Sequence, residues 1–180
     1  MTIGFRAGLA TATLLTAICL AERAEAADFR VLDFNASCAD LPALETARGT
    51  QMLDGPLPSG FQYAFRGREM DRDVVIAYAC RDGKLFRGAY IWAVPDEATA
   101  TAVYRAIKQK VTRELGAPSY DFASAEHRKK MEVAGATLSR ADTQVAFWDG
   151  KRAEAHASVA EPSADRGWRV SLSYTALGAE

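Results

Sequence analysis

The segment from Asp73 to Pro118 constrains the fold most strongly, because it combines two alternating stretches, a turn signal and a long amphipathic pattern. Residues 74–80 alternate β-branched or aromatic side chains with small ones, and this period of two indicates a strand. Asp82-Gly83 follows and favours the positive φ angles of a type I′ hairpin turn. A second alternating stretch covers 86–94. Because both stretches are apolar on both faces, they predict a β-hairpin near the middle of a sheet covered on both sides.

An amphipathic helix is predicted directly after this hairpin, over 96–115. Asp96 suits the first turn because its carboxylate can accept a free backbone N–H. Apolar residues then recur at three- and four-residue spacing from Ala100 to Leu115 and form one stripe. Gly116 can take the left-handed position after the last turn, and a proline follows it.

The two faces of the predicted hairpin differ in side-chain size. We expect the helix to pack on the face of small residues, which consists of Ala77, Ala79, Ala89 and Ala93. The other face carries Tyr78, Tyr90 and Trp92, which Trp168 and Tyr174 of a later strand can join. Two interpretations of this aromatic face stay open, core packing or a partly open surface that docks a partner. Under the second interpretation, the candidate partner-binding residues are Tyr78, Tyr90 and Trp92.

The first 26 residues have the pattern of a cleaved signal peptide. Arg6 precedes an apolar run from Ala7 to Ala21, and Ala24-Glu25-Ala26 matches the A-x-A cleavage pattern. The alternative, a transmembrane anchor, requires a longer apolar run. We therefore expect a periplasmic or secreted protein without a stable membrane anchor, in which residues 27–180 form a single domain.

Cleavage after residue 26 leaves two cysteines, Cys38 and Cys80. An even pair in an oxidising compartment predicts a disulfide bond, and two reduced buried thiols are the alternative. No C-x-x-C motif occurs, so the sequence does not indicate thiol redox catalysis.

Shorter predicted elements surround the central unit. A segment at 29–34 is predicted as an edge strand, and Asp40 begins a short helix that Gly49 ends. Alternating segments predict further strands at 61–65, 143–147, 153–159 and 168–175, and a second helix is predicted at 124–133. The predicted fold class is α+β, a mostly antiparallel sheet of about five to seven strands with the helix 96–115 packed on one face.

The tripeptide Asp-Gly-Lys occurs at 82–84 and again at 149–151. This repetition has two explanations, an old duplication of a hairpin unit or independent use of the same turn residues. Under duplication, the fold would consist of two β-β-β-α-like halves.

Motifs for catalysis, metal binding and nucleic-acid binding were not found. The two histidines, His127 and His156, have no second ligand at zinc spacing, and no nucleophile elbow, phosphate loop or EF-hand pattern occurs. The net charge of −1 gives no support for a nucleic acid or an anionic membrane as partner. We assign no catalytic, cofactor-binding or metal-binding residues.

Residues 78–84, Tyr-Ala-Cys-Arg-Asp-Gly-Lys, resemble the Y-x-C-x-x-G signature of periplasmic lysozyme inhibitors. That family is essentially all-β, and the predicted helix 96–115 departs from it. We expect an exported, non-enzymatic binding domain that recognises a protein or another envelope macromolecule, of the inhibitor or immunity type. The alternatives are a carrier of a small apolar ligand between sheet and helix, and an enzyme without a local sequence signature.

Overall fold

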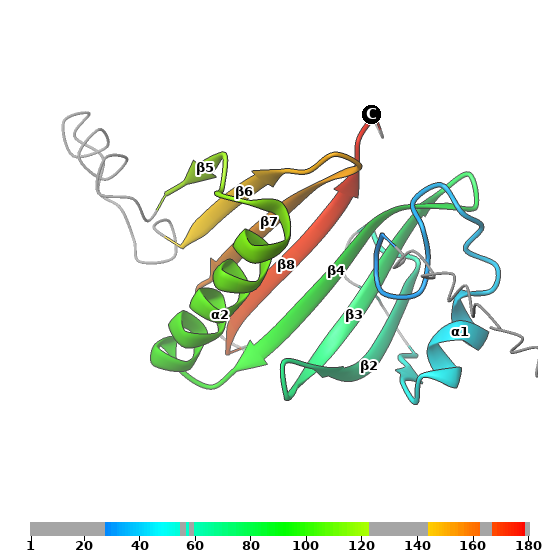
Figure 1. Ribbon diagram of the computed structural model, residues 1–180. Helices are drawn as coiled ribbons and strands as arrows, with labels where there is room; N and C mark the ends of the chain where they lie inside the picture. Colours follow the sequence, from blue (N-terminus) through cyan, green and yellow to red (C-terminus); the bar gives the residue numbers. More distant parts are fainter. Residues whose placement is uncertain (1–27, 55–56, 58–59, 123–143, 163–166, 179–180) are drawn as a thin grey trace, which may run out of the picture.

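The computed structural model describes residues 28–54, 57, 60–122, 144–162 and 167–178. These residues form two helices and one eight-stranded antiparallel sheet, which is not a closed barrel (Figure 1). The elements are α1 (Leu41–Ala47), β1 (Gln51–Met52), β2 (Tyr63–Glu69), β3 (Arg72–Arg81), β4 (Lys84–Val94), α2 (Glu97–Leu115), β5 (Tyr120–Asp121), β6 (Val145–Asp149), β7 (Ala153–Ala160) and β8 (Trp168–Ala176).

The α+β class and the antiparallel sheet are confirmed. The sheet has eight strands because a two-residue strand is added at each edge, β1 and β5, and such short strands carry no periodic signal. The helix predicted at 96–115 is present, with Asp96 as its cap: the Asp96 carboxylate accepts the Thr99 N–H at 2.7 Å. This hydrogen bond also lowers the pKa of Asp96. The predicted signal peptide and the predicted helix at 124–133 lie outside the described residues.

The strand order β1-β2-β3-β4-β8-β7-β6-β5 is symmetric about its centre. Each half consists of one helix followed by four antiparallel strands, and β4 pairs with β8 at the seam between the halves. The repeated Asp-Gly-Lys does not follow this symmetry, since its first copy joins β3 to β4 and its second joins β6 to β7. Asp82 and Gly83 have positive φ, whereas Asp149 and Gly150 do not. The two tripeptides therefore occupy turns of different geometry at non-equivalent places.

Helix α2 packs on the aromatic face of the sheet, and the prediction that it covers the alanine face is wrong. It lies over β6, β7 and β8 (Figure 1). Its buried stripe joins Tyr90 and Trp92 in one hydrophobic core, because this face offers more apolar area to remove from water. Close approach is provided by small residues on a different strand, Ala155 and Ala157 of β7.

The opposite face carries Ala77, Ala79 and Ala89. No helix of the described ranges covers this face, yet Ala77 and Ala79 are 0% exposed and Ala89 is 3% exposed.

The predicted edge strand at 29–34 is a tight turn instead. Phe29 bridges to Leu32, and Arg30 takes a positive φ of 55°. The Phe29 ring fills a depression above Gly88 of β4, where an added Cβ would lie 2.1 Å from the ring. This glycine explains why an apolar segment outside the sheet can bury its aromatic side chain in the core.

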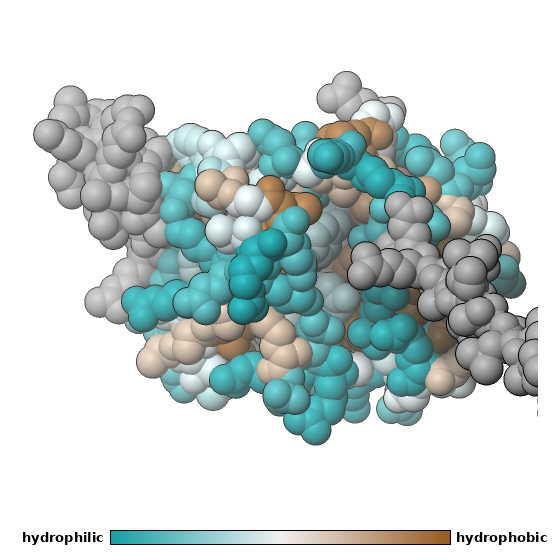
Figure 2. All heavy atoms as spheres, in the orientation of Figure 1, coloured by the Kyte–Doolittle hydropathy of each residue, from teal (hydrophilic) through white to brown (hydrophobic). Residues whose placement is uncertain are grey.

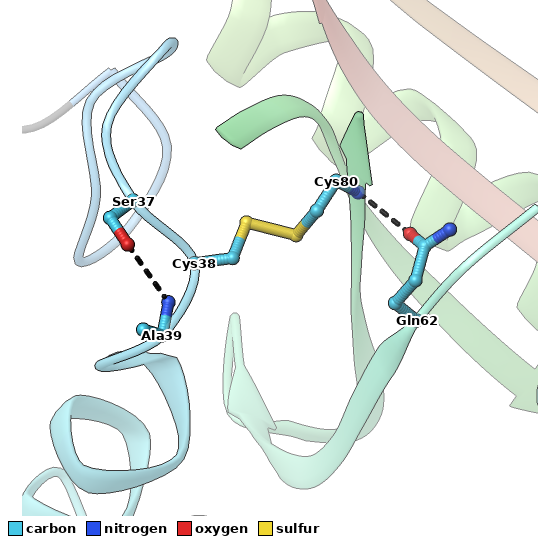
Figure 3. The surroundings of a disulfide bond; sticks show 5 residues. All are labelled: Ser37, Cys38, Ala39, Gln62 and Cys80. Atoms are coloured by element: carbon cyan, nitrogen blue, oxygen red, sulfur yellow. Dashed lines mark hydrogen bonds between the residues drawn. A yellow bond between two sulfur atoms is a disulfide. The ribbon is translucent and has the colours of Figure 1, made fainter. Parts of the chain in front are cut away.

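The disulfide Cys38–Cys80 is confirmed (Figure 3). It joins the segment before α1 to the end of β3, with a Cα–Cα distance of 6.5 Å. The Cys80 N–H donates to the side-chain oxygen of Gln62 at 2.7 Å, which links the residue directly before β2 to the same point (Figure 3). A disulfide is consistent with an oxidising, exported compartment.

Breaking this disulfide is expected to lower the free energy of unfolding by about 2–4 kcal/mol, because a sequence separation of 42 residues closes a long loop. The measurement is urea unfolding of the double variant Cys38→Ser/Cys80→Ser beside the wild type. Mass spectrometry with and without reductant first establishes the bond in the purified protein. Two free thiols there, or equal unfolding midpoints, would contradict the prediction.

Candidate functional site

The structure buries the three predicted partner-binding side chains. Tyr78, Tyr90 and Trp92 project from one face as predicted, but their exposed fractions are 0%, 7% and 1%. Tyr90 stacks on Trp92 with ring centres 5.8 Å apart, inside the core. All three belong to the hydrophobic core, and of the three only Tyr90 also lines a surface cleft.

A cleft of about 910 Å³ lies on the same face, between α2 and the turn that carries Phe29. It opens above the β4–β8 seam, and Figure 2 shows the surface hollowed beside the mainly hydrophilic outer side of α2. Its floor is aromatic, formed by Phe29, Tyr90 and Tyr174. The Phe29 ring centre lies 5.0 Å from that of Tyr90 and 6.0 Å from that of Tyr174.

Both floor tyrosines are held in the protonated form. Burial, reinforced by the nearby Glu69 carboxylate, raises the pKa of Tyr90 to about 12. Burial and the Glu114 carboxylate raise the pKa of Tyr174 as well. At neutral pH both hydroxyls are therefore uncharged: the Tyr174 hydroxyl faces Glu114 Oε2 at 3.5 Å as a donor, and the Tyr90 oxygen accepts from the Arg30 guanidinium. Lys110 lies above the floor, with its Nζ 5.9 Å from the centre of the Tyr90 ring.

One wall of the cleft is supported by a buried polar network around Glu45 of α1. The Arg30 Nε donates to Glu45 Oε1 at 2.7 Å, and the Tyr78 hydroxyl donates to the same oxygen. The Thr50 hydroxyl lies 2.9 Å from Glu45 Oε2. Burial, followed by the hydrogen bond to Glu45, raises the pKa of Tyr78, so its hydroxyl remains a donor. This network anchors the Phe29 turn and α1 to β3.

Charges of alternating sign continue from this network to α2. Arg30 lies 3.9 Å from a Glu69 carboxylate oxygen, and Lys110 Nζ lies 2.8 Å from the other. At the opposite end of the cleft, Arg152 pairs with Asp28 at 2.9 Å. Because these charges neutralise one another, the cleft does not require a strongly charged ligand. Its chemistry suits an apolar or aromatic group on the floor, with hydrogen-bonding groups at the rim.

Among the described residues, no group of three or more His, Cys, Asp or Glu side chains is arranged to hold a metal ion. Within the same ranges, no helix has the length and apolar character needed to cross a membrane.

Only some of the residues in and around the cleft were predicted from the sequence to lie together. Tyr174 joins the aromatic face as predicted, whereas Phe29, Arg30 and Glu45 were not recognised as site residues. One signal was available for Glu45, which follows Leu41 by four residues and therefore shares the buried side of α1. Nothing local marks Phe29, whose position depends on Gly88 in a distant strand.

Comparison with protein families, with curated proteins and with solved structures finds no match for this chain. The residues that resemble the lysozyme-inhibitor signature, 78–83, form the β3–β4 hairpin and include the disulfide cysteine Cys80. The described residues also contain two helices, whereas the lysozyme-inhibitor family is essentially all-β.

Proposed function

We propose that this chain is an exported, non-enzymatic binding domain that recognises a protein or another envelope macromolecule through the cleft above the β4–β8 seam. The observation that carries the proposal is a cleft with an aromatic floor and with walls whose acidic and basic side chains form ion pairs with one another. Tyrosine and phenylalanine provide a rigid apolar surface with polar handles, which is the composition of the central anchor in many protein interfaces.

The walls of the cleft favour a macromolecule over a small apolar ligand. A carrier needs an enclosed, largely apolar cavity, whereas seven of the side chains that line this cleft are charged. Arg152 and Lys110 remain partly exposed, with 58% and 30% of the side chain accessible. They can contact a partner at the rim while an apolar group of the partner occupies the floor. An inhibitor or immunity factor uses a rigid surface of this kind, and here the Cys38–Cys80 disulfide stiffens the adjoining segment.

Two exposed leucines allow a matched test of the cleft. Leu115 lies in the cleft with 36% exposure, and Leu177 lies after β8, outside the residues that line the cleft, with 47% exposure. We expect Leu115→Lys to weaken partner capture about tenfold, because it places a charge beside the aromatic floor. Leu177→Lys should leave capture unchanged. The same change of residue on either exposed leucine should shift the thermal midpoint little.

Capture is measured with the immobilised purified protein against the envelope fraction of its own cells, with each recovered protein quantified for the wild type and both variants. A partner that the Leu115 variant loses and the Leu177 variant retains supports the cleft. Equal loss in both variants would contradict it. Turnover of an envelope compound without any captured partner would favour the enzyme alternative.

A further inference from the structure

Residues 33–37, Asp-Phe-Asn-Ala-Ser, contain a modification motif that the proposed function does not use. An asparagine followed two residues later by serine or threonine, with no proline between them, is the acceptor motif for N-linked glycosylation of exported proteins. Asn35 and Ser37 meet this rule, because Ala36 stands between them. Asn35 is also the only asparagine of the 180-residue sequence, so any N-linked glycan on this chain is attached there.

The structure places this motif in a surface loop between the Phe29 turn and α1. Residues 33–37 lie outside every helix and strand of the described ranges. Asp33, Asn35 and Ser37 are exposed, whereas Phe34 is buried with an exposed fraction of 7%. The loop therefore presents alternate side chains to solvent, and the two side chains that define the motif are among the accessible ones.

The exposed side chains have the chemistry that glycan transfer requires. The Asn35 carboxamide supplies the nitrogen that is modified. The Ser37 Oγ accepts the Ala39 N–H at 3.2 Å, so its own hydroxyl hydrogen stays available for an enzyme to recognise (Figure 3). Asp33, two residues before Asn35, adds an exposed carboxylate that such an enzyme can also contact.

The folded loop is held against the β3–β4 hairpin. The Asn35 N–H donates to the Leu85 carbonyl at 2.8 Å, and the Leu85 N–H donates to the Ala36 carbonyl at 2.9 Å. The disulfide Cys38–Cys80 closes directly after the motif. These contacts fix the backbone of the loop, whereas an acceptor segment has to adapt to the active site of the enzyme that modifies it. We therefore expect the modification to precede the disulfide.

The folded protein can retain a glycan at this position. The Asn35 side chain is exposed, so an attached sugar extends into solvent without displacing a helix or strand. Asn35 has a φ of 68°, a left-handed conformation that asparagine adopts more readily than most residues. The same residue therefore suits both the turn and the modification.

We propose that the chain is N-glycosylated at Asn35 by an oligosaccharyltransferase of the envelope, before the Cys38–Cys80 disulfide closes. The Asn35 Nδ2 attacks the anomeric carbon of an oligosaccharide that is carried on a lipid diphosphate. A C–N bond forms and the C–O bond to the diphosphate breaks. The lipid diphosphate leaves with the electron pair of that bond, and Nδ2 loses one proton. This inference rests on the export included in the proposed function and is independent of the cleft.

The test is mass spectrometry of the protein purified from the envelope fraction of its own cells, both intact and after digestion. We expect the mass of one glycan on the peptide that contains Asn35, together with an intact Cys38–Cys80 disulfide. An unmodified Asn35 in disulfide-bonded envelope protein would overturn the proposal and leave export in place. Recovery of the chain only from the cytoplasm, with Cys38 and Cys80 as free thiols, would overturn export as well.

Two substitutions of Ser37 separate recognition by the enzyme from the role of this residue in the loop. Ser37→Ala removes the hydroxyl and should abolish the glycan, whereas Ser37→Thr keeps a hydroxyl and should retain it. The measured quantity is the modified fraction of the recovered protein, which a change in stability alone does not alter. A glycan that persists in Ser37→Ala or in Asn35→Gln would contradict N-linked modification, as would equal modified fractions in the two Ser37 variants.

The variant Cys80→Ser tests the order of the two steps. It prevents the disulfide and leaves residues 33–37 unchanged. We expect its modified fraction at Asn35 to equal or exceed that of the wild type, because the loop stays accessible for longer. A lower fraction would show that the enzyme acts on the bridged chain, and this result would overturn the proposed order.

Discussion

Replacing Trp92 by alanine is expected to lower the free energy of unfolding by about 3–5 kcal/mol, because the change leaves a large cavity in the core. Trp92 stacks on Tyr90 and is paired with Val170 across the β4–β8 seam. Trp92 lies in β4, and the β4–β8 pairing is the only one that joins the two halves of the sheet within the described residues. The measurement is equilibrium unfolding in urea, with the midpoint and slope compared with those of the wild type.

Trp92→Phe is the matched control for this cavity. The Trp92 Nε1–H is buried and has no hydrogen-bond partner in the described structure, so phenylalanine loses no hydrogen bond there. We expect the phenylalanine variant to lose less stability than the alanine variant, because it removes only part of the ring volume and leaves a smaller cavity. If the alanine variant kept the wild-type midpoint and lost partner capture instead, Trp92 would belong to a docking surface and the core assignment would be wrong.

Local features of the sequence were sufficient to predict several elements of the fold. Asp82-Gly83 adopts the positive φ angles of the predicted hairpin turn, Asp96 caps the predicted helix, and the two cysteines are bonded. Each of these features depends on residues close in sequence or on the pairing of two equivalent thiols. Period-two alternation likewise located the long strands, because a strand that packs on one face repeats every two residues.

The arrangement of these elements depends on contacts that local patterns do not encode. The hairpin strands are apolar on both faces, so alternation alone could not show which face α2 covers. Small residues were the correct signal for close helix approach, but the residues that serve this purpose lie on β7, a later strand. The cleft shares this dependence, because its floor combines Phe29, Tyr90 and Tyr174 from three distant segments.

Replacing Glu45 by alanine is expected to lower the free energy of unfolding by about 3–5 kcal/mol, because it leaves a buried cation without its partner. Glu45 is 0% exposed, and Arg30, which it binds, has only 9% of its side chain accessible. The variant also removes the acceptor of the Tyr78 hydroxyl, which is itself buried. The loss of unfolding free energy is measured by equilibrium unfolding in urea. The control is Glu154→Ala, which removes an exposed carboxylate of β7.

The control variant should stay within about 0.5 kcal/mol of the wild type, because Glu154 is exposed. Equal midpoints for the two variants would show that Arg30 finds another acceptor, such as the nearby Glu69 carboxylate. A second variant, Arg30→Met, distinguishes the cost of an unpaired charge from the loss of the contact itself. Glu45→Ala combined with Arg30→Met should be more stable than Glu45→Ala alone, because the double variant buries no unpaired cation. The same network supports the Phe29 turn, so the Glu45 variant should also lose the wall of the cleft and partner capture under conditions where the sheet remains folded.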